Sequence, residues 1–200
     1  MDETSTPARR RLPPAEREKA ILDGALALAR EGGLTALTTR AVATRVGVAP
    51  ALVAHYRPSM DAFVAEVFGT IVSAEREEVR RRLDPAAGVR ENLLRVVDAL
   101  VEEDRGDVTL IWVQAWAIGA RNEALAERVR AEMDDWQRQL TADIVDAADG
   151  PADAARAADA AWLLLSMIDG MNAHSLVKWA PDGRAALARR AVSAILDAGV

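Results

Sequence analysis

The chain has 200 residues, of which 50% are hydrophobic and none is cysteine, and its formal net charge is −6. This composition predicts a globular protein with one good core and room for a smaller second one, and it excludes a disulfide framework and thiolate chemistry. The charge is uneven, because residues 1–60 hold nine Lys or Arg and six Asp or Glu while the remainder is strongly acidic. A basic amino-terminal unit on an acidic body is typical of a protein that presents one end to nucleic-acid phosphates.

Residues 1–13 are predicted to form a flexible basic extension, because Arg9, Arg10 and Arg11 lie among prolines and polar residues. This extension either reaches a DNA backbone or minor groove, or it is a solvated tail that helps solubility. The start of the chain is polar and predicts no secretory signal. No apolar run is long enough to span a bilayer, so we expect a cytoplasmic protein without a membrane partner.

The rest of the chain is predicted to be all-α. Strand-like alternation is missing, and Gly or Pro residues recur at helix-length intervals. We divide the chain after its extension into an amino-terminal unit, 14–58, and a carboxy-terminal helical bundle, 59–200. Nine helices are expected, over 14–31, 39–46, 50–56, 60–83, 85–104, 108–118, 122–149, 153–178 and 182–198.

Residues 38–61 have the pattern of two short helices joined by a turn and followed at once by a third helix. Thr38 or Thr39 can cap the first of these helices. Gly47 stands where a helix commonly ends in a left-handed conformation, and Pro50 suits the first turn of the next helix. This spacing indicates a helix-turn-helix DNA-binding unit rather than an ordinary helical hairpin.

The helix expected over 50–56 carries small or polar residues on one side, which permits close approach to a DNA groove. Basic and hydroxyl side chains around it are suited to phosphates. The predicted DNA-binding residues are Thr39, Arg40, Arg45 and Tyr56 at phosphates, Pro50, Ala51, Ala54 and His55 at base edges, and Thr38, Ala49 and Arg57 beside them.

Three stretches resemble the motifs of a known family: 21–33, which ends on two glycines, then 38–56, and the turn 58–61. With them the chain resembles TetR-family transcriptional regulators, and their BetI-like branch more than others. The resemblance covers about residues 15–70 strongly and implies an amino-terminal helix-turn-helix unit followed by a ligand-binding and dimerisation bundle. A weaker match continues through Trp112, Trp116, Ala120, Trp136 and Ile168-Asp169-Gly170.

Three positions depart from the family pattern. The family usually has Ser or Thr where Ala49 stands, an aromatic residue where Arg57 stands, and Lys where Met60 stands. That Lys reaches a phosphate, so Met60 removes one charge-assisted contact. Arg57 either restores a charge nearby or is a solvated residue.

The helix expected over 153–178 is apolar on more than one side, which indicates burial both inside the monomer and against a partner. The resemblance implies that the last two long helices of each subunit form a four-helix dimer interface. A two-fold dimer can set two recognition helices roughly 34–36 Å apart, one turn of DNA. The predicted interface residues are Ala157, Ala161, Leu164, Ile168, Leu187, Ala191 and Ile195.

The resemblance also implies an inducer pocket in the bundle, and all five Trp residues lie beyond the DNA-binding unit. An apolar chamber with a few polar groups is the usual form of a small-molecule site. Each of these Trp and Met residues can instead be a core residue, and a Trp-rich box can hold a quaternary ammonium ion by cation–π attraction. The predicted lining residues are Trp112, Trp116, Met133, Trp136, Met167, Met171, Asn172 and His174.

Catalysis finds little support, because His55 and His174 lie on different units and no metal-ligand, P-loop, dinucleotide or nucleophile-elbow motif occurs. We therefore expect no catalytic residue, no metal and no cofactor. The expected protein is a regulator, most simply a repressor, that binds a palindromic double-stranded DNA operator as a homodimer. A small-molecule inducer would release it by swinging the helix expected over 60–83. Two alternatives remain: a helical ligand sensor that acts through a protein partner and binds DNA weakly, and an enzyme built on a helical bundle.

Overall fold

The computed structural model describes residues 13–148, 153–180 and 182–198, and its regular elements in these ranges are all helical. The predicted extension with Arg9, Arg10 and Arg11 lies outside them. The nine expected α-helices are all present in the described part of the chain. They are α1 (Pro14–Gly32), α2 (Thr39–Val46), α3 (Pro50–Tyr56), α4 (Met60–Arg81), α5 (Val89–Leu100), α6 (Gly106–Gly119), α7 (Glu123–Ala147), α8 (Ala154–Ser175) and α9 (Arg184–Asp197), with a short 3-10 helix η1 (Leu34–Ala36) after α1.

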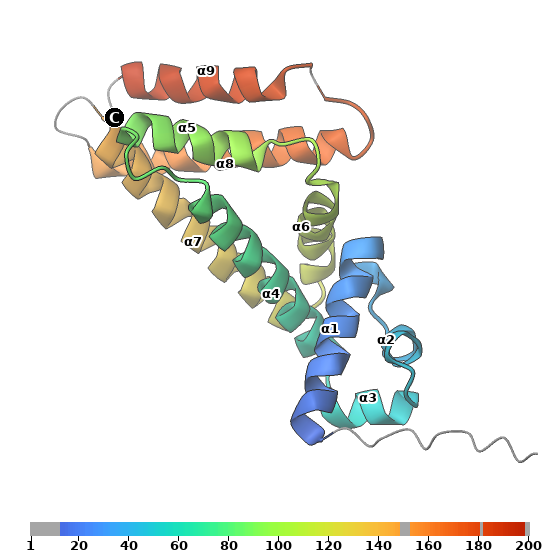
Figure 1. Ribbon diagram of the computed structural model, residues 1–200. Helices are drawn as coiled ribbons and strands as arrows, with labels where there is room; N and C mark the ends of the chain where they lie inside the picture. The colour runs from blue at the N-terminus through green and yellow to red at the C-terminus, as the bar shows by residue number, and fades with distance from the viewer. Residues whose placement is uncertain (1–12, 149–152, 181, 199–200) are drawn as a thin grey trace, which may run out of the picture.

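The helices form an elongated molecule with the amino-terminal unit at one end (Figure 1). Helices α1, α2 and α3 pack together there, and α4 and α7 run side by side away from them. Helices α5, α8 and α9 lie across the opposite end, and α6 connects that end to α1. None of the described helices combines the length and the apolar character that crossing a bilayer requires.

Local signals explain the ends of the helices in the amino-terminal unit. The side chain of Thr38 accepts a hydrogen bond from the Ala41 backbone N–H at 3.1 Å and so caps α2. Gly47 ends α2 in the left-handed conformation, with φ of 67°. Pro50 opens α3 at its first turn, where a missing N–H costs no hydrogen bond.

The expected helix over 85–104 is shorter in the structure, where α5 spans Val89–Leu100. Asn92 holds residues before it in a turn, because its side chain accepts from the Asp84 N–H and donates to the Asp84 carbonyl, both at 2.9 Å. At the other end, Arg105 and Asn172 donate to the carbonyls of the last turn of α5. Side-chain hydrogen bonds to the backbone, one of them from Asn172 of α8, therefore set these ends. The other predicted ends agree with the structure within three residues.

Two hydrophobic cores stabilise the molecule. The first combines α1, α2 and α3 with the first half of α4, part of α6 and the start of α7. The second combines the end of α4 with α5, α7, α8 and α9. Trp112 packs against both cores. The first core thus extends beyond residue 58, the predicted domain boundary, and it joins the amino-terminal unit firmly to α4 and α6.

Candidate functional site

The helix-turn-helix unit buries its apolar side and exposes most of the predicted contact residues. Val42 of α2 and Val53 of α3 are fully buried in the first core. The predicted residues that are exposed are Thr38, Arg40, Arg45, Ala49, Pro50, Ala51, Ala54 and His55, while Thr39 and Tyr56 are half-buried. An exposed α3 with small residues fits the requirement for entering a major groove.

Arg45 is exposed on α2 and forms an ion pair with Glu31, near the end of α1. This hydrogen bond holds the pKa of Glu31 below its usual range. Arg45 must therefore exchange Glu31 for a phosphate if it contacts DNA. Thr38 already uses its side-chain oxygen to cap α2, although its hydroxyl hydrogen remains available to a phosphate.

Arg57 is not the solvated residue that one interpretation predicted, because it is held in ion pairs inside the protein, whereas its contact with DNA stays a prediction. Its guanidinium pairs with Glu18 of α1 at 2.7 Å and with Glu66 of α4 at 3.3 Å, and only 14% of its side chain is exposed. It also lies 5.0 Å from the centre of the Phe63 ring. Arg57 thus clamps α1 to α4, and Met60 nearby packs against the first core.

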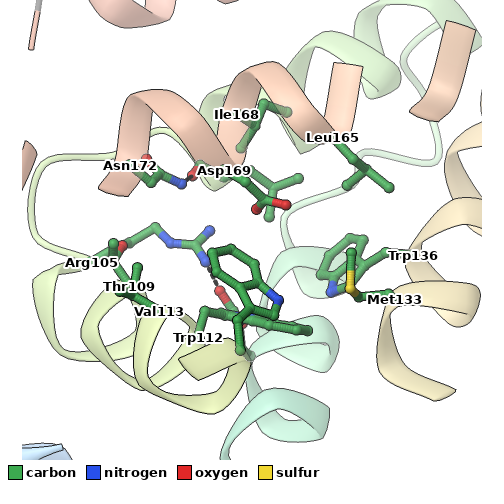
Figure 2. A pocket seen from close by; sticks show the side chains of 13 residues that line it. Arg105, Thr109, Trp112, Val113, Met133, Trp136, Leu165, Ile168, Asp169 and Asn172 are labelled. Atoms are coloured by element: carbon green, nitrogen blue, oxygen red, sulfur yellow. Dashed lines mark hydrogen bonds and ion pairs between the residues drawn. The ribbon is translucent and has the colours of Figure 1, made fainter. Parts of the chain in front are cut away.

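A cavity open to solvent lies between α4, α6, α7 and α8 (Figure 2); its empty space, together with the solvent at its mouth, amounts to about 580 Å³. Five of the eight predicted pocket residues line it: Trp112, Trp116, Met133, Trp136 and Asn172. The other lining residues are Glu75, Leu100, Arg105, Thr109, Val113, Leu165, Ile168 and Asp169.

Three predicted pocket residues lie elsewhere. Met171 is buried in the second core and Met167 packs against that core. His174 is exposed, and its ring packs edge-on against Trp179 with 4.7 Å between centroids. The reason is helical geometry, since the cavity face of α8 consists of residues 165, 168, 169 and 172, which are three and four apart.

Sequence reasoning missed the charged residues of the cavity, above all Asp169. Its carboxylate points into the cavity among Trp112, Leu165 and Ile168, and no described residue forms a hydrogen bond or ion pair with it (Figure 2). Burial raises the pKa of Asp169 to about 6, and the nearby positive charge of Arg105 lowers it by a smaller amount. A polar residue on the apolar cavity stripe of α8 was the signal in the sequence that could have identified it.

Glu75 and Arg105 form an ion pair at the cavity wall. The Glu75 carboxylate also accepts a hydrogen bond from the Trp112 indole at 3.3 Å, and Arg105 donates to the carbonyl of Ala99 at 2.8 Å. Burial lowers the pKa of Arg105 to about 10, so its guanidinium remains charged at neutral pH. The cavity therefore holds two carboxylates and one cation beside three indole rings.

Helix α6 joins this cavity to the DNA-binding unit. Its Trp112 and Trp116 line the cavity, while Gln114 accepts a hydrogen bond from the Thr35 N–H at 3.0 Å. At the start of α6, Asp107 pairs with Arg30 of α1 at 3.0 Å. Any displacement of α6 therefore acts directly on α1 and η1.

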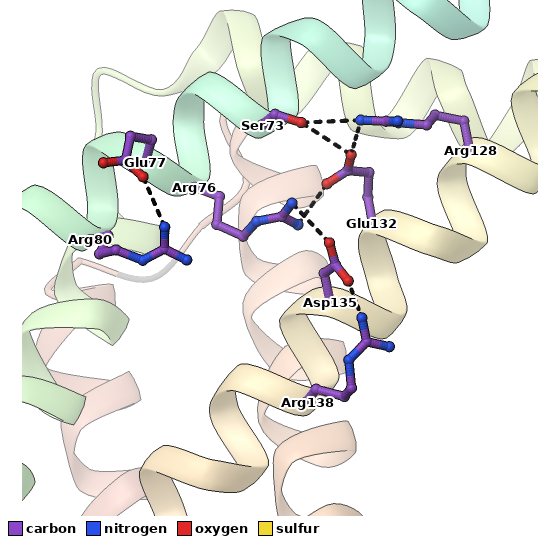
Figure 3. A network of polar contacts seen from close by, with 8 residues as sticks. All are labelled: Ser73, Arg76, Glu77, Arg80, Arg128, Glu132, Asp135 and Arg138. Atoms are coloured by element: carbon purple, nitrogen blue, oxygen red, sulfur yellow. Dashed lines mark hydrogen bonds and ion pairs between the residues drawn. The ribbon is translucent and has the colours of Figure 1, made fainter.

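A buried ionic network holds two cavity walls, α4 and α7, together (Figure 3). Glu132 of α7 is only 2% exposed and accepts from Arg76 of α4 at 2.7 Å and from Ser73 of α4 at 3.3 Å. Arg128 pairs with the same carboxylate at 2.5 Å. A buried carboxylate with this many donors fixes the relative position of the two helices.

The predicted dimer interface requires a correction. Ala157, Ala161, Leu164 and Ile168 are at most 2% exposed, because they pack in the second core of their own monomer. They have no surface left for a partner. The three predicted residues of α9 keep some surface, with Leu187 exposed and Ala191 and Ile195 half-buried.

Comparison with known proteins agrees with this architecture. Residues 21–67 match the model of bacterial regulatory proteins of the tetR family, and residues 89–199 match the carboxy-terminal model of BetI-type transcriptional repressors. The chain is 28% identical over 172 residues to the HTH-type transcriptional regulator BetI of Agrobacterium fabrum, covering 84% of this chain and 81% of that protein.

Solved structures show the same fold. A transcriptional regulator from Rhodococcus sp. Rha1 has a TM-score of 0.73 at 20% identity and covers 91% of this chain and 97% of its own. A transcriptional regulator from Saccharomonospora viridis in complex with choline has the same TM-score and identity, with coverage of 92% and 96%. These relatives are described as regulators of transcription rather than enzymes. The chain belongs to the TetR family of bacterial transcriptional regulators, in the branch with a BetI-type carboxy-terminal domain.

Proposed function

We propose that this protein is a repressor that binds a palindromic operator as a homodimer and leaves the DNA when a small organic cation binds in the cavity. One observation carries the proposal: Asp169 lies without an ion-pair partner among the described residues in an aromatic cavity whose wall, α6, also holds the DNA-binding unit. A ligand in this cavity would therefore contact the same helix that holds the helix-turn-helix unit.

The chemistry of the cavity favours a cation over other small molecules. Three indole rings can attract a weakly hydrated cation through their faces, and Glu75 and Asp169 outnumber the single Arg105. An anion would be repelled, and a neutral ligand would leave the Asp169 carboxylate desolvated and unpaired. The choline complex of the Saccharomonospora viridis protein supports the same class of ligand.

The surface that would bind a second copy of the chain lies on α8, the segment after it, and α9. Five of the seven large hydrophobic residues that are exposed among the described residues are here: Trp162, Leu163, Val177, Trp179 and Leu187. Gly170 lies between them on α8, and a Cβ added there would meet no atom within 4 Å. Exposed aromatic residues around a glycine permit close helix packing against a partner.

Gly170→Arg tests this surface without disturbing the monomer. We expect the variant to sediment as a monomer, because the new Cβ would meet no atom of its own subunit while the charged side chain would block a partner. Ala142→Arg, an exposed position on α7, is the matched control and should remain dimeric. A dimeric Gly170→Arg protein would exclude this face as the interface.

The ligand would act through α6 and α4. Trp112 of α6 packs edge-on against Phe68 of α4 with 5.0 Å between ring centroids, so a ligand against Trp112 affects both helices. Such a ligand shifts the population toward non-binding conformations only by its difference in affinity for the two states. In these conformations the two α3 helices would no longer match one turn of DNA.

Enrichment of genomic DNA fragments on the purified protein, at two salt concentrations and with or without choline, tests the function as a whole. We expect one palindrome that survives moderate salt and is lost with choline. If no fragment survives moderate salt, the operator part fails, and a role through a protein partner gains support. A palindrome that is retained with choline and other small cations would contradict the proposed ligand class.

A further inference from the structure

We propose that Arg105 is an internal substitute for the ligand cation. Without ligand, Arg105 pairs with Glu75. A bound cation takes its place at this carboxylate, and the exchange releases both Arg105 and the start of α6. The proposal rests on the proposed function and adds the residue that couples the ligand to the rest of the protein.

The position of Arg105 fits a replaceable partner. Its guanidinium lies inside the aromatic cavity, beside Trp112 and across from Asp169, and reaches Glu75 (Figure 2). Both side chains are buried, with 14% of Arg105 and 8% of Glu75 exposed. The Nε of Arg105 is buried without an acceptor among the described residues. A buried ion pair with an unsatisfied donor is a costly arrangement, because desolvation offsets much of its attraction.

A cation of suitable shape can replace the guanidinium. Guanidinium and quaternary ammonium groups are both weakly hydrated, and both favour the faces of aromatic rings. Glu75 would keep its hydrogen bond from the Trp112 indole during the exchange, so the carboxylate would remain oriented toward the ligand. Asp169 would supply the second negative charge.

The displaced Arg105 has a destination. A second, polar pocket lies on the other side of the pair and shares Glu75 and Arg105 with the cavity. It carries four further carboxylates and three further arginines; three of the carboxylates pair with these arginines, and Asp104, which forms no ion pair with a described residue, can receive the released guanidinium. These residues are Glu78, Glu102, Asp104 and Asp107, with Arg30, Arg81 and Arg82.

The exchange would reach the DNA-binding unit through α6. Arg105 immediately precedes α6, two residues before Asp107, which holds Arg30 of α1. One face of the same helix carries Gln114, the acceptor for the Thr35 N–H. Movement of the Arg105 backbone would therefore loosen the contacts that position η1 and α1.

The test compares choline with the neutral alcohol in which a tert-butyl group replaces its trimethylammonium group. Binding to the full chain is measured by calorimetric titration, and the response of the DNA-binding unit is measured by hydrogen exchange of the Thr35 amide. The variants are Arg105→Met and Glu75→Gln. Arg80→Met is the control, because Arg80 is exposed, pairs with Glu77 and lines neither the cavity nor the polar pocket.

Arg105→Met should bind choline about tenfold more tightly than the wild type, because the competing internal cation is gone. Choline should no longer change Thr35 exchange in this variant, although it binds. Glu75→Gln should lose most of the preference for choline over the alcohol, and Arg80→Met should behave as the wild type. If Arg105→Met is too unstable alone, choline should restore its folding and the alcohol should not, because only choline supplies the charge that Glu75 lacks.

The outcomes separate this inference from the proposed function. If the wild type prefers choline but Arg105→Met binds it no more tightly, or still responds at Thr35, the role of Arg105 is refuted and the ligand class stands. A destabilised Arg105→Met protein that choline does not rescue refutes it equally. If neither the wild type nor any variant distinguishes choline from the alcohol, the cationic ligand and the inference fail together.

Discussion

Replacing Asp169 by asparagine should stabilise the protein at neutral pH while weakening its affinity for cations. Burial raises the pKa of this carboxyl to about 6, well above its unfolded value of 3.8. The folded protein therefore holds the proton more tightly than the unfolded chain. The contribution of Asp169 to the free energy of unfolding consequently falls as the pH rises from about 4 to about 6 and is level above that range.

The size of the effect follows from the pKa shift. A shift of about two units, each worth about 1.4 kcal/mol, corresponds to roughly 3 kcal/mol of destabilisation by the ionised Asp169 at pH 7. Asparagine has no charge to desolvate, although its amide also needs hydrogen-bond partners in the cavity. We therefore expect Asp169→Asn to gain about 1–3 kcal/mol at pH 7.

Urea denaturation of both proteins between about pH 7 and about pH 4 measures this difference. The advantage of the variant should shrink toward zero as Asp169 becomes protonated in the wild type. Asp159→Asn, an exposed position on the same helix, is the matched control and should show little change. A variant that is less stable at pH 7, or an advantage that does not depend on pH, would refute the reasoning.

Choline binding provides a second readout for the same residue. In the wild type, affinity should fall as the pH drops below about 6 and approach that of Asp169→Asn, because protonation removes one of the two negative charges that attract the ligand. The other charged groups facing Asp169 are Glu75 and Arg105, and Asp169→Asn retains both. The variant should therefore bind more weakly at pH 7 and lose most of this pH dependence.

Three further substitutions test the polar contacts elsewhere. Glu132→Gln should lower the free energy of unfolding by about 1–3 kcal/mol in urea titrations, because Arg76 would keep only the more exposed Asp135 as an ionic partner; a loss below about 1 kcal/mol would show the network to be dispensable. Arg45→Ala should reduce the steepness of the plot of log affinity for duplex DNA against log salt concentration by about one unit, and an unchanged slope would exclude a phosphate contact of Arg45. Glu31→Gln should instead tighten DNA binding, because it frees Arg45 from its ion pair. Gly33→Ala should cost roughly 1–3 kcal/mol in thermal unfolding, because φ is 76° and the new Cβ would lie 2.4 Å from the Gln114 side-chain oxygen; wild-type stability would mean that this junction adapts freely.

The local architecture could be predicted from the sequence because its causes lie within a few residues. Thr38 caps the helix that begins beside it, Gly47 ends that helix, and Pro50 opens the next. Apolar spacing likewise predicted a buried side for the helix that contains Ala157, which lies in the second core. These signals suffice for nine helices and for a helix-turn-helix unit.

Only the tertiary structure decided which side of each helix is inside and which charges meet. Ala157 lies in the monomer core and Trp162 on the surface, although both are apolar residues of α8. Arg57 finds its partners 39 positions before it and nine after it, and Asp169 becomes a cavity residue only because α4, α6 and α7 surround it. Burial and ion pairing depend on groups brought together from distant parts of the chain, and the spacing of residues along one helix does not contain that information.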